Sequence, residues 1–389
     1  MLKSLALIVV SGLLITTLGL SQATAPAAGL DDAHKAKAQA MAKKGVDFLL
    51  SQKNEQGGWG FDPKETHPAL TAMVLKTLIQ SGMKVDDPAI AGGFEQLMKF
   101  KQPDGGFYNP KEGNANYTTS VAAMVFATAN NPKYKEPLDG AVKFLRGQQI
   151  TAGGKTPSGE AIAKDHPYEG GVSYGKQGRP DLSNQGFWME AMHEAGVSGD
   201  DEAMQRAAAF VKRLQNRSEG MEGEFKFKGE DDGGFIYAVN KKDGVFVGES
   251  MAGDSDRGLR SYGSMTYTGF KSMLYANVSK KDPRVQAAFE WIRKNWRLDT
   301  NPNMPEASSK QGLFYYYQVL AKAMRAYGQD VITDSRGIAH NWRHELIDTL
   351  APLQKEAGQW GPNEADRWME GDAKLVTCYV LMALQDVLK

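Results

Sequence analysis

Two aspartates of this chain lie where a carboxyl group is suited to acid chemistry. Asp254 and Asp256 follow the acidic run 230–232 in a stretch rich in glycine and charged residues, shortly before an apolar segment that starts near residue 264. Carboxyl groups in such a place can donate a proton or hold a divalent cation through their oxygens. We predict that Asp254 and Asp256 are the catalytic acids if the protein is an enzyme; otherwise they belong to a solvated loop.

A second acidic group lies before two other apolar segments. Asp366, Glu370 and Asp372 precede the last apolar segment, and Asp181 precedes an earlier one. Paired carboxylates at the mouth of a cavity suit hydrolysis or elimination of polysaccharides. Asp181, Asp366 and Asp372 are therefore candidate ligand-binding residues. The alternative for Asp181 and Asp372 is helix capping, which their positions already explain.

Aromatic residues gather near the starts of the same apolar segments. Rings on a cavity wall can stabilise a cation or stack on a sugar, although packing between neighbouring helices explains them equally well. Four consecutive aromatics, 314–317, cannot all face one direction on a helix, so at least one of Tyr315, Tyr316 and Tyr317 should point into a cavity. The aromatic residues that we predict to bind ligand are Tyr174, Trp188, Tyr262, Tyr267 and Tyr316.

Other catalytic motifs are absent from the sequence. Of six histidines, only His340 and His344 have the i, i+4 spacing of a metal site, and no glutamate follows His340 as the metalloprotease pattern requires. The repeat register places this segment on a solvent-facing helix. No nucleophile elbow or phosphate-binding loop occurs. We therefore expect no metal and no cofactor.

The elements that must position these residues form a repeat. Each unit has an amphipathic segment ending in glutamine, a glycine turn with an aromatic residue, and a second segment that is apolar nearly all round. The copies begin at Gln52, Gln102, Gln148, Gln215 and Gln354, with a fainter copy at 291–296. About six such pairs of outer and inner helices predict an all-α fold, a closed α/α toroid. An open superhelix is the alternative.

Caps and insertions follow the same register. Asp87, Asp201 and Asp282 are expected N-caps of outer helices, and glycines end the inner helices. Two long insertions, 151–181 and 216–262, each fall between an outer and an inner helix. In a closed ring both would lie on one face, where loops usually carry function.

Composition and the N-terminus bound the location and the partners. The 46 basic residues balance the 46 acidic ones, so no net charge favours nucleic acid. Lys3 followed by an apolar run indicates a signal peptide, 1–25, and hence export to the periplasm or outside the cell. An uncleaved membrane anchor is the alternative, and no later segment is expected to span a membrane. Residues 26–389 are predicted to form a single domain, with Cys378 as a core residue.

The glutamine, glycine and tryptophan of the repeat resemble the QW repeat of the terpenoid cyclase and protein prenyltransferase superfamily. The strongest copies are 52–60, 102–107 and 354–361, and the chain is most similar to single-domain, exported squalene cyclase-like proteins of bacteria. The resemblance implies an α/α toroid, an apolar or isoprenoid-like ligand, and chemistry of the terpenoid cyclase type. The sequence departs from the signature motifs of the superfamily. Asp254-Ser255-Asp256-Arg257 lacks the third carboxylate and the Thr-Ala of the cyclase acid motif, and Val376 replaces the aspartate of the prenyltransferase zinc pair with Cys378.

Three functions remain open from the sequence. The first is a toroid that binds an apolar or isoprenoid-like ligand in a central cavity, with or without cyclase chemistry. The second is a polysaccharide hydrolase or lyase, and the third is a non-catalytic binding or scaffold protein. A deep aromatic cavity favours the first, an open acidic groove the second and a filled centre the third. No protein partner is predicted.

Overall fold

The computed structural model describes residues 28–389 except 157–158, 176–177, 220–224 and 364. The predicted signal peptide, 1–25, lies outside these residues. None of the helices in the described ranges has both the length and the apolar composition needed to cross a bilayer.

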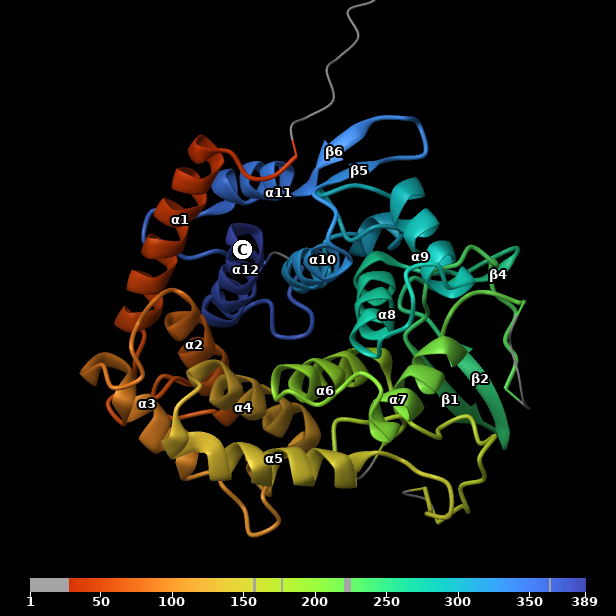
Figure 1. Cartoon of the computed structure of the whole chain (residues 1–389), viewed down its shortest axis with the longest axis horizontal. Coiled ribbons are helices and arrows are strands. Elements are labelled where there is room, and N and C mark those ends of the chain that lie inside the picture. The colour runs from red at the N-terminus through yellow and green to blue at the C-terminus, as the bar shows by residue number, and fades with distance from the viewer. Residues whose placement is uncertain (1–27, 157–158, 176–177, 220–224, 364) are drawn as a thin grey trace, which may run out of the picture.

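Helices of two kinds alternate along the described chain, as Figure 1 shows. The outer helices are α1 (Asp32–Ser51), α3 (Pro88–Met98), α5 (Lys135–Gln148), α7 (Glu202–Arg213), α9 (Pro283–Lys294) and α11 (Trp342–Leu350). The inner helices are α2 (Pro68–Gln80), α4 (Ala115–Ala129), α6 (Leu182–Glu194), α8 (Gly263–Tyr275), α10 (Leu313–Tyr327) and α12 (Ala373–Leu388). Three short 3-10 helices, η1 (Pro132–Tyr134), η2 (Glu306–Ser308) and η3 (Ala351–Leu353), lie in the connections.

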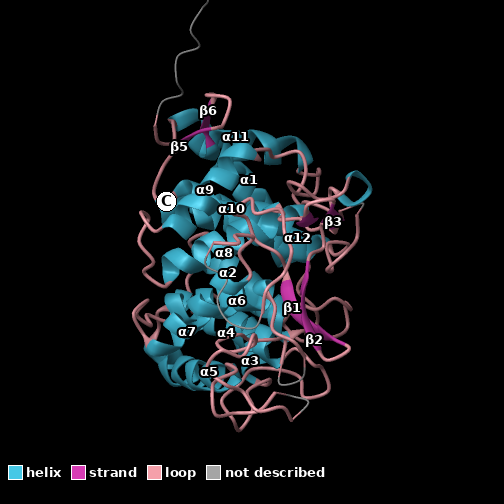
Figure 2. Ribbon diagram, turned by 90° about the vertical axis from the view of Figure 1, so that its right-hand side faces the viewer, coloured by secondary structure: helices cyan, strands magenta, loops and turns pink. Residues whose placement is uncertain are grey.

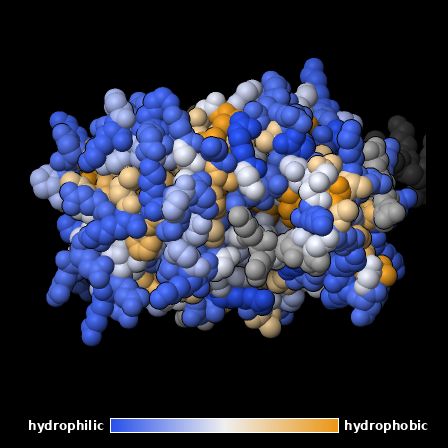
Figure 3. All heavy atoms as spheres, turned by 90° about the horizontal axis from the view of Figure 1, so that it is seen from below, coloured by the Kyte–Doolittle hydropathy of each residue, from blue (hydrophilic) through white to orange (hydrophobic). Residues whose placement is uncertain are grey.

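The two kinds of helix differ in burial as their sequence patterns predict. In α2 every residue from Pro68 to Leu78 is buried, whereas α7 buries one face and keeps its charged residues on the other. Each inner helix packs against the next, and α12 also packs against α2. The first and last inner helices, about 300 residues apart in sequence, are therefore neighbours. The side of the molecule that includes α5 is mostly hydrophilic (Figure 3).

The predicted helix ends are confirmed. The side chains of Asp87, Asp201 and Asp282 each accept a hydrogen bond from a backbone N–H two residues further on, in the first turns of α3, α7 and α9. Gly82 and Gly328 follow inner helices with φ of 99° and 71°, in the left-handed region that glycine tolerates best.

Three glutamines join neighbouring repeats through paired hydrogen bonds, whereas Gln52 donates to Ser51 Oγ and Gln102 donates within its own turn, to Phe100 O and Tyr108 O. The Gln215 amide donates to Gly233 O and to Arg284 O of α9, at 2.9 and 2.8 Å. The Gln354 amide donates to Gly358 O and to Met41 O of α1, at 2.8 and 3.0 Å, and so links the end of α11 to α1. In the third repeat the corresponding residue is Gln149, and the prediction of Gln148 was wrong by one position. The Gln148 side chain cannot do this because it belongs to the last turn of α5.

The expectation of a purely helical chain is corrected by three antiparallel hairpins. They pair β1 (Ala238–Lys242) with β2 (Val245–Glu249), β3 (Asp254–Ser255) with β4 (Gly258–Leu259), and β5 (Val331–Thr333) with β6 (Ala339–Asn341). The first two lie in the insertion 216–262, on one side of the helical body (Figure 2). Their short strands flank tight turns, at Asp243-Gly244 and Asp256-Arg257, that helical periodicity does not reveal.

Ion pairs lie between the inner helices toward their C-terminal ends. The Glu190 carboxylate lies 2.5 Å from Lys271 Nζ and 2.6 Å from Lys322 Nζ, and all three side chains are at most 5% exposed. Lys76 pairs with Glu194, and Arg325 with Asp386. Buried charges are tolerated when paired in this way. Glu194, Lys322, Arg325 and Asp386 of this network border a pocket of about 550 Å³ at the C-terminal ends, and a second cavity lies toward the N-terminal ends.

Candidate functional site: an aromatic cavity at the N-terminal ends of the inner helices

A cavity of about 450 Å³ lies where the inner helices begin. All six inner helices or the residues that cap them contribute to its wall, and the two predicted insertions contribute Tyr174 and Tyr237. The prediction that both insertions reach one face is thus supported. The residues that line it include His67, Glu112, Tyr117, Tyr174, Ser183, Asn184, Phe187, Tyr237, Tyr262, Met265, Tyr315, Trp368, Met369, Glu370 and Tyr379.

A chain of aromatic rings forms the wall. Phe187 of α6 meets Tyr117 of α4 edge-on at 5.0 Å between ring centroids, and stacks with Tyr315 of α10 at 6.0 Å. Tyr315 lies 5.9 Å from Tyr379 of α12. Burial raises the pKa of Tyr117, Tyr315 and Tyr379, so their hydroxyls are neutral. The wall is therefore a largely apolar surface with neutral hydroxyl groups.

Trp368 and Met369 border the mouth of the cavity. They are 41% and 51% exposed, which is unusual for large apolar side chains. Both residues have positive φ, 56° and 66°, where a side chain other than glycine or asparagine is strained. The segment before α12 therefore holds two apolar side chains at the opening at a cost in backbone energy.

Glu370 is the buried carboxyl group of the cavity. Its side chain is fully buried, with Oε1 accepting from Tyr315 N at 2.8 Å and Oε2 accepting from Asn363 Nδ2 at 2.7 Å. Desolvation raises the pKa of Glu370 to about 7, although these hydrogen bonds favour the carboxylate. Glu370 is thus an acid that exchanges its proton near neutral pH in an apolar setting.

His67 and Glu112 form a second polar pair at the wall. His67 caps α2 through Nδ1, which accepts from Leu70 N at 3.4 Å, and its Nε2 lies 3.3 Å from Glu112 Oε2. Burial lowers the pKa of His67, the nearby Glu112 opposing that shift. The neutral imidazole with its proton on Nε2 fits both contacts.

Asp181 acts as a capping residue below the cavity surface. Its carboxylate accepts from Asn184 N, Asn184 Nδ2 and Ser183 Oγ, at 2.9, 2.8 and 2.8 Å. It is 1% exposed, and burial raises its pKa. Ser183 and Asn184 line the cavity while Asp181 itself does not. The Asp181 carboxylate therefore orients two polar residues that line the cavity, Ser183 and Asn184.

The structure divides the predicted aromatic residues. Tyr174 and Tyr262 line the cavity, and Tyr315 satisfies the expectation that one ring of the run 314–317 faces inward. Trp188, Tyr267 and Tyr316 are fully buried and lie outside the lining. Trp188 Nε1 donates to Leu145 O at 2.8 Å, and Tyr316 Oη donates to Arg297 O at 2.8 Å. These two hydrogen bonds tie an inner helix to the outer helix of the same repeat or to the segment that follows it, whereas Tyr267 of α8, packed edge-on against Tyr316 of α10, joins two repeats.

The predicted acids outside the cavity fall in three places. Asp254 and Asp256 are exposed in and beside the small β3–β4 hairpin. Asp372 caps α12, accepting from Lys374 N and Leu375 N at 2.8 and 3.1 Å. Asp366 is exposed and accepts from Gly371 N at 2.8 Å. The structure does not bring these four carboxylates together with Asp181 in the cavity.

Sequence reasoning overlooked several lining residues. Tyr117, Tyr379, His67 and Glu112 carry no recognised motif, and Glu370 was grouped with its aspartate neighbours without a sign of its burial. One signal was available: each of Tyr117, Tyr315 and Tyr379 lies within the first two turns of an inner helix. Scanning the helix starts alone would have found these three rings.

Comparison with known proteins supports the fold. No protein-family model matches the chain. A drimenyl diphosphate synthase of Streptantibioticus cattleyicolor is 30% identical over 102 residues, covering 26% of this chain and 19% of that protein. Another, from Streptomyces showdoensis, is 28% identical over 129 residues, covering 33% of this chain and 24% of that protein. The matches thus span about a quarter or less of these relatives.

Solved structures match over far more of the chain. An alpha-1,6-mannanase of Salegentibacter sp. HEL1_6 superposes with a TM-score of 0.60 at 12% identity, covering 90% of this chain and 100% of that one. The type II terpene cyclase MstE of Scytonema gives 0.53 at 15% identity, covering 90% and 98%. At these identities the likeness concerns the fold alone. The class defined is a mostly helical protein similar to α/α toroids, with type II terpene cyclases and mannanases among its structural neighbours.

Proposed function

We propose that this chain is an exported α/α toroid that binds an apolar, isoprenoid-like ligand in the cavity at the N-terminal ends of its inner helices. The observation that carries the proposal is the ring of aromatic side chains, contributed by successive inner helices, around a space of about 450 Å³. That volume lies within the usual range for a small-molecule site. The packing of α12 on α2 supports a closed ring as the scaffold.

The same cavity supports acid-initiated chemistry on such a ligand. Proton transfer to an alkene needs a carboxyl group that keeps its proton and is shielded from water. Glu370 is shielded from water and, with its pKa raised to about 7, keeps its proton at mildly acidic pH, whereas Asp254 and Asp256 lie in solvent on a hairpin. In this proposal Glu370 protonates an alkene carbon and the aromatic wall stabilises the resulting cation. The Glu370 carboxylate then takes a proton from a neighbouring carbon, which completes an isomerisation and restores the acid.

Similar proteins support the ligand class. One structure of the Scytonema cyclase, a variant with a TM-score of 0.51 at 15% identity, is in complex with geranylgeranyl dihydroxybenzoate. The curated relatives are drimenyl diphosphate synthases. The first is bound to a geranylgeranyl compound, and the other two are named for the synthesis of drimenyl diphosphate. These names support an isoprenoid-like ligand for the aromatic cavity of this chain.

Titration of the chain with geranylgeraniol tests binding. Phe187→Leu removes the ring that contacts both Tyr117 and Tyr315, and it should weaken binding about 10-fold, the effect of one aromatic contact. Phe289→Leu is the matched control, because Phe289 is also packed against two rings, Phe270 and Tyr327, but lies on outer helix α9. Equal affinities for the two variants, or no binding by the unmodified chain, would refute the proposed site.

A carbohydrate-directed enzyme is the second candidate, favoured by one observation. Two carboxyl groups line the cavity in different settings, the buried Glu370 and Glu112 beside His67, and such a contrast suits acid and base roles. A mannanase variant with two consecutive aspartates replaced is inactive. In this chain no consecutive pair lines the cavity: Asp31-Asp32, Asp86-Asp87, Asp200-Asp201 and Asp231-Asp232 lie elsewhere. Cleavage of alpha-1,6-mannotriose that is abolished by Glu370→Gln would favour this candidate over the first.

Export and the domain boundary belong to the same proposal. Cleavage after the signal peptide 1–25 would leave residues 26–389 as one domain. Intact-mass measurement of the chain recovered from the envelope or medium of the source cells tests this. A mass that includes residues 1–25 would support the uncleaved anchor instead.

A further inference from the structure

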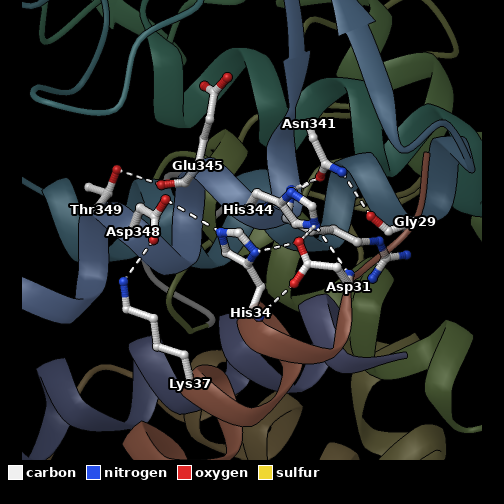
Figure 4. Close-up of polar contacts among 10 residues, drawn as sticks. Gly29, Asp31, His34, Lys37, Asn341, His344, Glu345, Asp348 and Thr349 are labelled. Carbon is white, nitrogen blue, oxygen red and sulfur yellow. Dashed lines mark hydrogen bonds and ion pairs between the residues drawn. The ribbon is translucent and has the colours of Figure 1, made fainter. Parts of the chain in front are cut away.

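Two histidines far apart in sequence meet at the junction of the first and last outer helices. His34 lies in the first turn of α1 and His344 in the first turn of α11 (Figure 4). Their rings are stacked, with centroids 3.9 Å apart and planes within 2° of parallel. Sequence reasoning had considered His344 only with His340, which lies in β6 and contacts Asp334 and Glu345 instead.

A carboxylate faces the same edge of both rings. Asp31 Oδ2 lies 2.8 Å from His34 Nδ1 and 3.6 Å from His344 Nε2. The donor atoms of Asp31, His34 and His344 all lie within 4.8 Å of one another. Ligand atoms around a tetrahedral zinc ion, with bonds of about 2.0–2.2 Å, are roughly 3.3 Å apart. A contraction of the larger separations would therefore bring the three donors to bonding distance.

The hydrogen bonds of the cluster favour metal binding at these atoms. Asp31 N donates to His344 Nε2 at 3.3 Å, so this nitrogen carries no proton, and a metal ion would take over its lone pair from this long hydrogen bond. On the other side of His34, Nε2 lies 3.5 Å from Asp348 Oδ2, and Asp348 is held in turn by Lys37 at 2.7 Å. A histidine that binds a metal through one nitrogen usually directs the other to a carboxylate in this way.

The backbone on both sides of the cluster is fixed. Asn341 Oδ1 caps α11 by accepting from Arg343 N and His344 N, at 3.1 and 3.2 Å. Its Nδ2 donates to Gly29 O at 2.8 Å, two residues before Asp31 (Figure 4). The donors thus sit on helix starts that are joined to each other, and only side chains need to move.

We propose that Asp31, His34 and His344 form a site for a divalent transition metal, of which Zn²⁺ is the type, at the junction of α1 and α11. Two imidazoles with one carboxylate select such ions over Mg²⁺ and Ca²⁺, which prefer oxygen ligands. Because the parallel rings direct their lone pairs side by side, binding requires one imidazole to tilt until the lone pairs converge. The ion would fasten α11 to α1, across the same junction as the Gln354–Met41 hydrogen bond.

Calorimetric titration of the untagged, chelator-treated full chain with Zn²⁺ and with Mg²⁺ tests the proposal. We expect one Zn²⁺ per chain, no Mg²⁺ binding, and a melting temperature that rises with Zn²⁺ concentration. His34→Gln and His344→Gln should abolish the binding. Asp348→Asn should weaken it about 10-fold or more, the usual effect of removing an outer carboxylate.

The matched control is His193→Gln. His193 is an exposed histidine whose ring also stacks on a neighbour, Tyr275, at 4.1 Å, but it lies outside the cluster. The His193→Gln variant should bind Zn²⁺ as the unmodified chain does. Asp31→Asn keeps the helix cap and is a third variant, which tests the site even if the two histidine variants do not fold. Absence of Zn²⁺ binding, or binding that persists in both histidine variants, would overturn the proposal.

Discussion

At the scale of single residues, environment decides what a carboxyl group can do here. Glu370 is fully buried and its pKa rises to about 7, while Asp372, two residues later, is a helix cap and Asp366, four residues earlier, is exposed. The sequence places all three acids in one short segment before α12. It does not show which of them the fold will bury, because that depends on Asn363 and on the start of α10, 55 residues away.

The raised pKa of Glu370 makes folding depend on pH. The folded state holds this proton more tightly than the unfolded chain, where the pKa is near 4.5, so its contribution to stability is full below pH 4.5 and is lost as pH rises to about 7. The loss should be on the order of 3 kcal/mol. Glu370→Gln should remove this slope, measured as the free energy of unfolding in urea at pH 5 and pH 8.

The test compares the free energy of unfolding at the two pH values within each protein, not the stability of Glu370→Gln with that of the unmodified chain. The new amide directs an NH₂ group at Asn363 Nδ2, which lowers stability equally at both pH values. The slope is independent of that cost. If the variant lost as much stability between pH 5 and pH 8 as the unmodified chain, the assignment of the shifted pKa to Glu370 would be wrong.

At the scale of elements, the sequence predicted the helices and the glutamine turns that connect them, but it did not predict the cavity. The alternation of amphipathic and apolar segments, the aspartate caps and the C-terminal glycines are local patterns, and the structure follows them. The β hairpins in the insertion 216–262 break the helical pattern, and the position of Gln149 depends on a contact with α7. Such tertiary contacts leave no periodic trace in the sequence.

The paired bonds of Gln354 predict a specific loss of stability. Gln354→Ala removes two donated hydrogen bonds and leaves Met41 O and Gly358 O without this partner, which should cost about 1–3 kcal/mol. Gln359→Ala is the control in the same turn, since its Oε1 makes no hydrogen bond. Urea denaturation of both variants is the measurement, and losses of equal size would show that Gln354 does not fasten α11 to α1.

The turn glycine beside it provides a second comparison. Gly358 has φ of 96°, and a Cβ there would lie 2.3 Å from Lys44 O of α1. Gly82 has almost the same φ, 99°, with open space around it. Gly82→Ala should therefore show the backbone strain alone, about 1 kcal/mol, and Gly358→Ala should cost clearly more in thermal denaturation. A smaller loss for Gly358→Ala would contradict the close approach of the turn to α1.

At the scale of the whole molecule, the two ends of the ring differ in character. Charged side chains such as Glu194 and Lys322 border a pocket of about 550 Å³ near the C-terminal ends of the inner helices, and aromatic side chains surround the cavity of about 450 Å³ near the N-terminal ends. The insertions 151–181 and 216–262 both supply residues to the open end. The aromatic cavity thus lies at the end that receives the insertions, and the charged pocket lies at the other end. The sequence predicted the ring and the face, but the depth of the cavity required the packing of all six inner helices.

The most direct test of the central claim is a crystal structure of the chain grown with geranylgeraniol. We predict that the isoprenoid lies between Phe187, Tyr315 and Met265, with Glu370 at its side. Ligand bound elsewhere, or a cavity without ligand under saturating conditions, would contradict the assignment of this cavity as an isoprenoid site.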